Sequence, residues 1–285
     1  MSDDKENKLV VLLSIDGWGL SLNTENNAIR KAHIDGFKNL VTSYPATVVT
    51  MPNFKISQNY RLLGSGLEIN QINNLSNLSL SKIISQAGLK QLKIATSQDF
   101  PLASVFLNNS SESFNNEDWL IVDEKKNKFL SFFKRDGLEN NLIKQINSGN
   151  YNFIFSILSD ISRAVFKGDF LETISVLERI SESLEKISQV VLEKDGVLII
   201  TSTYGGAEDV FNIGTGLANK KKTDNAVPFL IIGNEYRGKT IGLAEAPNND
   251  ISLLSPQGTY LDILPTILKI LDLPIPEEIS GKSFI

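Results

Sequence analysis

Cysteine is absent from this chain of 285 residues, and histidine occurs once, as His33. Without cysteine the chain has no disulfides, iron–sulfur clusters, thiolate zinc sites or cysteine nucleophiles. With one imidazole it cannot build a metal site from several histidines, and any catalytic triad would have to use His33. These two scarcities exclude many common metal centres and nucleophiles within the chain.

A surplus of positive charge and a long hydrophobic run are also missing. Lysine and arginine number 28 against 33 aspartates and glutamates, which gives a net charge of −5 and argues against nucleic-acid binding. The apolar run at residues 9–15 is too short to span a membrane and has no signal-peptide cleavage context. We therefore expect a cytoplasmic protein with no nucleic-acid partner and no membrane partner.

Short apolar runs alternate with amphipathic helices along the chain. The run at 9–15 ends at Asp16-Gly17, which is typical of a strand buried on both faces with a turn at its carboxyl end. Similar runs predict further strands, and apolar residues at helical spacing predict helices over 79–87, 170–191 and 260–271. The further strands are predicted at 92–95, 103–107, 153–158, 197–201 and 227–232. Alternating strands and helices predict an α/β fold with a largely parallel sheet.

Two polar stretches interrupt this alternation. Residues 57–80 are rich in Asn and Ser, and residues 108–118 are similar, so both are predicted to be loops. The first is unusual, because a long polar segment inside a compact domain is usually functional or a remnant.

Several segments carry a family resemblance, in the same order along the chain. They are 12–19 (LLSIDGWG), 27–29 (NAI), 44–47 (YPAT), 87–95 (AGLKQLKIA), 196–201 (GVLIIT) with Gly205 and Ala207-Glu208, 225–229 (NAVPF), 264–268 (LPTIL), 273–276 (LPIP) and 281–283 (GKS). Together they resemble the cofactor-independent (2,3-bisphosphoglycerate-independent) phosphoglycerate mutases of the alkaline-phosphatase superfamily. The resemblance implies a three-layer sandwich with a mostly parallel central sheet and helices on both faces. It implies one metalloenzyme-type domain over residues 1–285, with residues 57–79 as a short loop in place of the family's inserted second domain.

The resemblance also implies where the family's site would lie. That family is described as transferring a phosphoryl group through a serine while two divalent metals, manganese or zinc, hold the oxygens. Its serine falls near Ile56, next to Ser57, and a substrate-contacting lysine falls near Asp99. Its metal ligands fall on Asp16, Ser162, Phe166, Thr203, Tyr204 and Lys222.

Of these positions only Asp16 keeps the chemistry of a metal ligand. A lysine or an aromatic ring cannot take the place of an imidazole, and one carboxylate cannot hold two ions. We therefore expect Asp16 to be the vestige of a metal site and the other five to be degenerate positions. We expect no catalytic or cofactor-binding residue and no bound metal.

Alternative interpretations of single residues remain open. Asp16 could simply cap the turn at Gly17. Glu208 and Asp209 could join it in an acidic patch for magnesium or calcium, or could be solvated loop acids. Tyr204 and Phe166 are predicted to fill the vacated pocket by packing.

Three functions follow from these observations. The first is a catalytically degenerate relative with a binding, scaffolding or regulatory role and an unidentified protein partner. The second is a different enzyme that acts on phosphate esters through Asp16, Asp160, Glu208 and Asp224. The third is phosphoglycerate mutase or phosphatase activity in a site completed by a partner chain. His33 matches none of the ligand positions, which favours the first.

Overall fold

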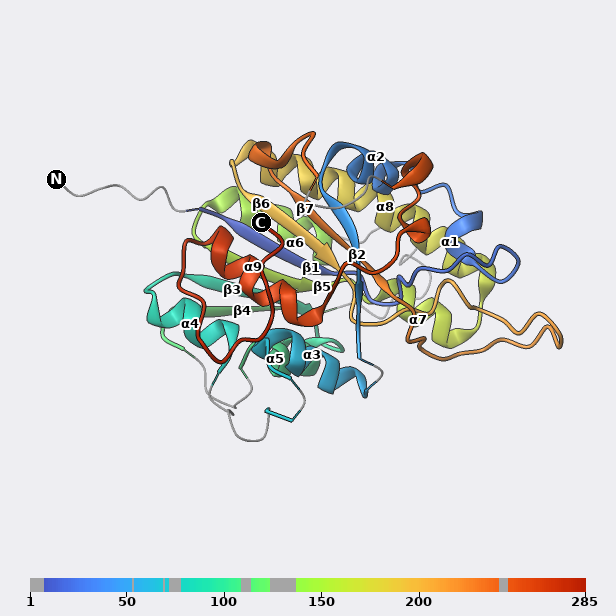
Figure 1. Cartoon of the computed structure of the whole chain (residues 1–285), viewed down its shortest axis with the longest axis horizontal. Coiled ribbons are helices and arrows are strands. Elements are labelled where there is room, and N and C mark those ends of the chain that lie inside the picture. The colour runs from blue at the N-terminus through green and yellow to red at the C-terminus, as the bar shows by residue number, and fades with distance from the viewer. Residues whose placement is uncertain are drawn as a thin grey trace.

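An eight-stranded sheet forms the centre of the computed structural model, which describes residues 8–52, 54–68, 70–71, 78–108, 114–123, 137–240 and 246–285. The strands lie in the order β4-β3-β5-β1-β6-β7-β2-β8 (Figure 1). Their bounds are β1 Val10–Ser14, β2 Ala46–Thr50, β3 Gln91–Thr96, β4 Glu117–Val122, β5 Phe153–Ile157, β6 Val197–Thr201, β7 Val227–Ile232 and β8 Gly258–Thr259. The strand β1 is therefore central.

The sheet is mostly parallel. The five strands from β4 to β6 run in one direction, whereas β7 is antiparallel to both β6 and β2. Every residue of β1, β5, β6 and β7 is buried. A strand that is covered on both faces needs apolar side chains on both, which explains the continuous apolar runs of the sequence.

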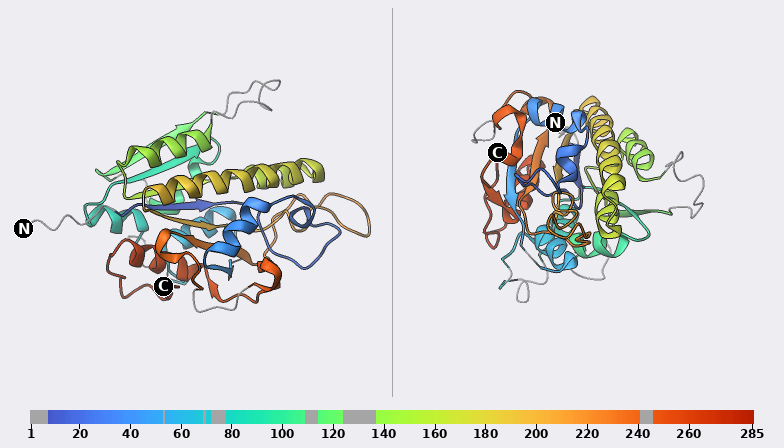
Figure 2. Two further views of the ribbon diagram at one scale, coloured as in Figure 1. Left: turned by 90° about the horizontal axis from the view of Figure 1, so that it is seen from above. Right: turned by 90° about the vertical axis from the view of Figure 1, so that its right-hand side faces the viewer.

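Helices cover both faces of the sheet, so the molecule has three layers (Figure 2). One face carries α1 Ala28–Lys31, α2 Asp35–Ser43, α6 Leu138–Ser148, α7 Asp160–Lys167 and α8 Phe170–Glu193. The other face carries α3 Ile56–Ser65, α4 Leu80–Gln86, α5 Phe100–Asn108 and α9 Ile263–Ile270. Short 3₁₀ helices are η1 Asn234–Tyr236, η2 Pro247–Asn249, η3 Ile251–Leu253 and η4 Tyr260–Asp262. The predicted α/β fold is confirmed.

The long helix α8 begins where the sequence predicts. The side chain of Asp169 caps it by accepting a hydrogen bond from the backbone N–H of Glu172 at 2.9 Å. Its apolar stripe packs on the sheet, and charged residues occupy the other side. Among the described residues, no helix combines the length and the apolar character needed to cross a membrane.

Two predictions of local structure are wrong. Residues 103–107 belong to α5 rather than to a strand, and residues 57–65 belong to α3 rather than to a loop. In α5 the apolar run is too short to distinguish a buried strand from a buried helix. In α3 apolar residues recur at Ile56, Tyr60 and Leu63, and Gly66 ends the helix with a φ of 63°. Residues 69, 72–77 and 109–113 of the predicted loops lie outside the described residues.

A buried ion pair joins β3 to β4. Lys93 Nζ lies 2.6 Å from Glu117 Oε1, and neither side chain is exposed. The ammonium also lies 4.3 Å from the centroid of the Trp119 ring. Burial lowers the pKa of Lys93 to about 8, although Glu117 favours the charged form.

This lowered pKa predicts a pH dependence of stability. Between about 8 and the ordinary value of 10.5, the unfolded chain keeps a proton that Lys93 gives up in the folded protein. The free energy of unfolding is therefore expected to gain a contribution that increases with pH in this window. Urea unfolding at pH 8, 9 and 10 measures it as the difference between the protein and a Lys93→Met/Glu117→Met variant. Parallel pH profiles for the two proteins would contradict it.

Candidate functional site

The carboxylate of Asp16 follows the central strand β1 and is fully buried. Its Oδ1 accepts hydrogen bonds from Ser14 Oγ at 2.6 Å and from Thr203 Oγ1 at 3.0 Å, with the Thr203 N–H at 3.3 Å. Its Oδ2 accepts a hydrogen bond from the hydroxyl of Tyr60 at 2.6 Å. We refer to Ser14, Asp16, Tyr60 and Thr203 as the Asp16 network. Both oxygens of the carboxylate are thus occupied by neutral donors.

The strand register explains why Thr203 reaches Asp16. Ser14 pairs with Thr201 at the carboxyl ends of β1 and β6, so the segments that leave the two strands run side by side. The N–H of Gly17 then donates to the carbonyl of Tyr204 at 3.1 Å. Gly17 has a φ of 96°, and a Cβ there would lie 2.9 Å from the backbone nitrogen of Ser162. This turn therefore requires glycine.

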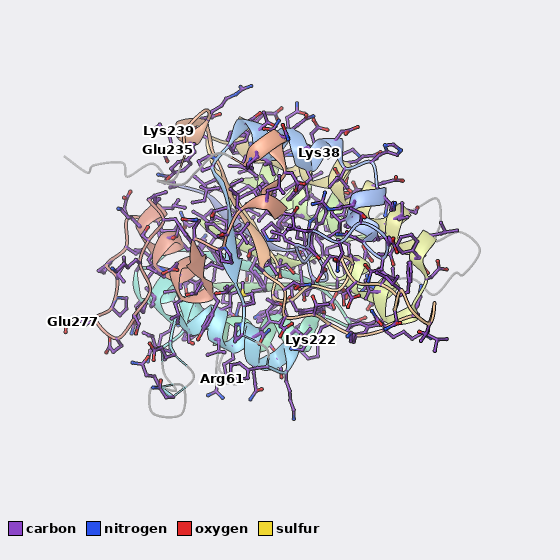
Figure 3. All side chains as sticks on the ribbon, turned by 45° about the vertical axis from the view of Figure 1, so that its right-hand side comes forward. Lys38, Arg61, Lys222, Glu235, Lys239 and Glu277 are labelled. Atoms are coloured by element: carbon purple, nitrogen blue, oxygen red, sulfur yellow. The ribbon has the colours of Figure 1, made fainter. Side chains whose placement is uncertain are left out.

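The helix α3 covers the site from the other side. Besides Tyr60, it contributes Asn59, whose Nδ2 donates to the carbonyl of Thr203 at 2.9 Å. Burial raises the pKa of the Tyr60 hydroxyl well above its ordinary value of 10.0, and the charge of Asp16 adds to this, so the hydroxyl stays a donor. Lys222, which is labelled in Figure 3, donates to the carbonyl of Phe54 just before α3. The family's serine falls near Ile56, at the start of α3. In this structure α3 packs over Asp16 and is hydrogen-bonded to it through Tyr60.

The tyrosine at position 204 is buried, as predicted for a residue that fills the pocket. Its side chain is 4% exposed, and its hydroxyl lies 2.8 Å from Ser162 Oγ. Burial raises the pKa of Tyr204 well above 10.0, so it too stays protonated. The N–H of Ser162 donates to the carbonyl of Asp16 at 3.1 Å. The structure therefore brings Asp16, Ser162, Thr203 and Tyr204 together.

Phe166 and Lys222 do not join this group. Phe166 is 40% exposed, so the prediction that its ring fills the pocket is wrong. The buried face of α7 is formed by residues 161, 162, 164 and 165, which leaves position 166 toward solvent. The ammonium of Lys222 is directed to Phe54, as described above.

Glu208 is fully buried and joins the loop after β1 to the two ends of the loop between β6 and β7. Its Oε2 accepts hydrogen bonds from the N–H groups of Gly19 at 3.1 Å and Gly206 at 2.7 Å. Its Oε1 accepts from Asn225 Nδ2 at 3.0 Å and from the hydroxyl of Thr223. The interpretation of Glu208 as a solvated loop acid is therefore wrong.

Asp209 has partners of its own, so it does not form an acidic patch with Asp16 and Glu208. It accepts hydrogen bonds from Asn26 Nδ2 at 2.6 Å and from Asn219 Nδ2 at 2.8 Å.

The other acidic candidates also lie outside the Asp16 network. Asp99 accepts hydrogen bonds from the hydroxyls of Thr96 at 2.8 Å and Ser159 at 2.6 Å, and Arg163 lies between it and Asp160. Asp224 is exposed, as is Ser57 in the first turn of α3. The carboxylates of the alternative enzyme hypothesis are thus not assembled around one point.

The residues around Asp16 do not fit a divalent metal. Manganese and zinc are held by carboxylates, imidazoles or thiolates, whereas the neighbours of Asp16 are hydroxyls that donate to it. Within the described parts of the chain, no three Asp, Glu or His side chains gather in a way that could hold an ion. Burial also raises the pKa of Asp16 above its ordinary value of 3.8, which disfavours the ionised form that a metal needs.

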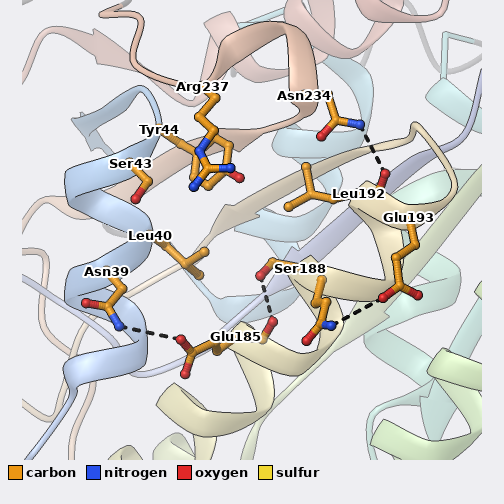
Figure 4. A pocket seen from close by; sticks show the side chains of 11 residues that line it. Asn39, Leu40, Ser43, Tyr44, Glu185, Ser188, Leu192, Glu193, Asn234 and Arg237 are labelled. Carbon is orange, nitrogen blue, oxygen red and sulfur yellow. Dashed lines mark hydrogen bonds between the residues drawn. The ribbon is translucent and has the colours of Figure 1, made fainter.

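An open groove between α2 and α8 is a separate feature (Figure 4). Leu40, Tyr44 and Leu192 are its apolar side chains, and Glu185 and Arg237 are among the charged ones. The groove lies near the amino end of β6. Asp16 lies at the carboxyl ends of the parallel strands, so the groove and Asp16 are at opposite ends of these strands. None of its lining residues belongs to the Asp16 network.

Comparison with known proteins gives the family context. The family model described as "Metalloenzyme superfamily" matches residues 8–275. The 2,3-bisphosphoglycerate-independent phosphoglycerate mutase 2 of Methanosarcina barkeri is 27% identical over 213 residues, which are 72% of this chain and 37% of that protein. The corresponding enzyme of Antithamnion sp. is 30% identical over 213 residues, 72% of this chain and 39% of that protein. This chain thus spans less than two fifths of the length of these two relatives.

A solved structure confirms the predicted alkaline-phosphatase-like fold. The alkaline phosphatase from the Antarctic bacterium TAB5 has a TM-score of 0.59 and 14% sequence identity, with 93% of this chain and 98% of that chain covered. The similarity in sequence and the shared fold lead to one assignment. This chain belongs to the metalloenzyme superfamily, and it is related to the cofactor-independent phosphoglycerate mutases.

Proposed function

We propose that this chain is a catalytically degenerate relative of the phosphoglycerate mutases with a binding, scaffolding or regulatory role. One observation carries the proposal. Asp16 is the single position that keeps the chemistry of a metal ligand, and Ser14, Tyr60 and Thr203 occupy both of its oxygens.

A cation at Asp16 would have to displace these donors. The hydroxyls of Tyr60 and Thr203 would then be buried without their acceptor, at a cost of about 1–3 kcal/mol for each group. The cation would gain one carboxylate in return, because positions 162, 203 and 204 hold serine, threonine and tyrosine. The hydrogen-bonded arrangement is therefore favoured over the metal-bound one.

The length of the chain motivates a second candidate. Since it spans 37% of the Methanosarcina barkeri enzyme, a partner chain could supply a nucleophile and a substrate-binding domain for a phosphate ester. Such a partner would still not restore ligands at Ser162, Thr203 and Tyr204. We therefore rank this metalloenzyme function below the non-catalytic one.

Metal removal tests the proposal. We expect EDTA treatment to leave the melting temperature unchanged, and added manganese or zinc to leave it unchanged as well, because a ligand raises stability only if it binds the folded state. Elemental analysis of the purified protein should find no stoichiometric manganese or zinc. An assay with 3-phosphoglycerate should show no mutase activity.

The matched control is Asp16→Asn, which keeps the shape of the side chain and removes its charge. The parent protein and this variant should respond alike to EDTA and to the metals. Stoichiometric metal that is lost in the variant would overturn the proposed function.

A further inference from the structure

Large apolar side chains are exposed at the end of the molecule where the carboxyl ends of β1, β5 and β6 lie, which is also the end where Asp16 lies. Five of the eight large apolar side chains exposed among the described residues occur here, each 40 to 75% exposed. They lie in the loop after β1, in the α7–α8 region after β5 and in the loop after β6. We refer to these residues as the apolar end: Leu22, Phe166, Leu171, Ile213 and Leu217.

The loop after β6 contacts both of the other segments that carry the apolar end. Asn26 of the first loop donates to the carbonyl of Phe211 at 3.0 Å. The rings of Phe170 and Phe211 lie 5.3 Å apart between centroids, in an edge-to-face arrangement. At the turn between α7 and α8, a Cβ on Gly168 would lie 2.6 Å from the Cβ of Ala218. The segments therefore form one surface, at the end of the molecule marked by α7 in Figure 1.

The tip of the loop after β6 is a hydrogen-bonded turn that leaves the side chains of Ile213 and Leu217 exposed. Phe211 and Ala218 form an antiparallel bridge. The N–H of Asn212 donates to the carbonyl of Leu217 at 2.8 Å, and Asn212 Oδ1 accepts from the N–H of Thr215 at 2.9 Å. Ile213 and Leu217 flank this turn. A surface that is already ordered loses little conformational entropy when it binds.

The five residues of the apolar end expose an area comparable to that of one interface. At about 200 Å² for a fully exposed large apolar residue, together they expose roughly 600 Å². A stable interface buries about 800 Å² from each partner. The apolar end and its polar surroundings are therefore of the right size for one interface.

Charges of both signs surround the apolar end. Lys167 pairs with Glu172 at 2.6 Å, and Lys221 lies 3.9 Å from Asp209. A surface of one sign would repel a second copy of itself, whereas a mixed surface can pair with itself across a two-fold axis. This balance favours a second copy of the chain as the occupant.

We propose that two copies of this chain associate through the apolar end as a two-fold symmetric dimer. In this dimer the 212–217 tip of each copy packs on the surface around the α7–α8 turn of the other. The proposal does not depend on the loss of metal binding, because no residue of the apolar end belongs to the Asp16 network.

Sedimentation analysis over a range of concentrations tests the dimer. We expect a concentration-dependent dimer for the parent protein. Leu171→Glu and Leu217→Glu should each weaken it by about 10-fold or more, because each charge enters a two-fold interface twice. The matched control is Ile275→Glu, an exposed position in the tail after α9, which should leave the dimer unchanged. Circular dichroism checks that all variants are folded.

The absence of cysteine permits a second measurement on the same face. A nitroxide attached to Thr215→Cys should show dipolar coupling between two copies, and Leu171→Glu should lower the coupled fraction at the same protein concentration. A chain that stays monomeric would overturn the proposal, even if another protein were found to bind the apolar end. A dimer that tolerates both Leu171→Glu and Leu217→Glu, or that shows no coupling, would also overturn it.

Discussion

Lys93→Met is expected to lower the free energy of unfolding by about 3–5 kcal/mol, the usual cost of removing one member of a buried ion pair. The ammonium of Lys93 and the carboxylate of Glu117 are 2.6 Å apart with no exposure to solvent. Methionine retains the apolar stem but leaves Glu117 buried without this counter-charge. Urea unfolding at pH 7 measures the loss.

The control for this prediction is the double variant Lys93→Met/Glu117→Met. Apolar residues of similar volume often replace a buried ion pair with little loss of stability. The double variant should therefore recover most of what the single variant loses. A double variant less stable than Lys93→Met would show that the carboxylate does not depend on the lysine.

Asp16→Ala is expected to destabilise the protein by about 3 kcal/mol, because three buried hydroxyl donors lose their acceptor at once. These donors are Ser14, Tyr60 and Thr203. Asp16→Asn should cost about 1 kcal/mol or less, since the amide oxygen still accepts while the hydroxyl of Tyr60 can accept from the amide nitrogen and donate to Ser14. Thermal and urea unfolding of the two variants give the comparison.

The two variants together distinguish a hydrogen-bond centre from a cation site. A cation site depends on the charge of the carboxylate, so asparagine would be as harmful as alanine. A hydrogen-bond centre depends on acceptors, so asparagine is tolerated. Equal losses of stability in Asp16→Asn and Asp16→Ala would contradict the proposed function.

The strands of the sheet could be predicted from sequence where burial on both faces makes them continuously apolar. This holds for β1, β5, β6 and β7. The edge strand β4 does not follow from the sequence, because its apolar run at 119–122 is only four residues long and comes directly after Glu117 and Asp118 at the end of a polar stretch. Residues 103–107 fit either a strand or a helix, because four of these five residues are apolar and the run is short, although Pro101 in the first turn of α5 is a helix signal.

The candidate site could be predicted in part. The resemblance identified Asp16, Ser162, Thr203 and Tyr204 by their positions, and the structure places them together. Tyr60 was missed, because it lies 44 residues from Asp16 in a stretch with no family motif. Its hydrogen bond depends on how α3 packs on the sheet, which no local sequence pattern reports.

The way in which the donors share Asp16 has an evolutionary consequence. Oδ1 is occupied by Ser14 and Thr203, and Oδ2 by Tyr60, which come from β1, from the turn after β6 and from α3. Replacing one of these three donors does not free both oxygens of Asp16. Each replacement removes a hydrogen bond that holds a different segment of the fold in place. Under the proposed function, a return to metal binding would pass through intermediates that have lost hydrogen bonds at Asp16 and are less stable. Selection for stability would then oppose each of these steps.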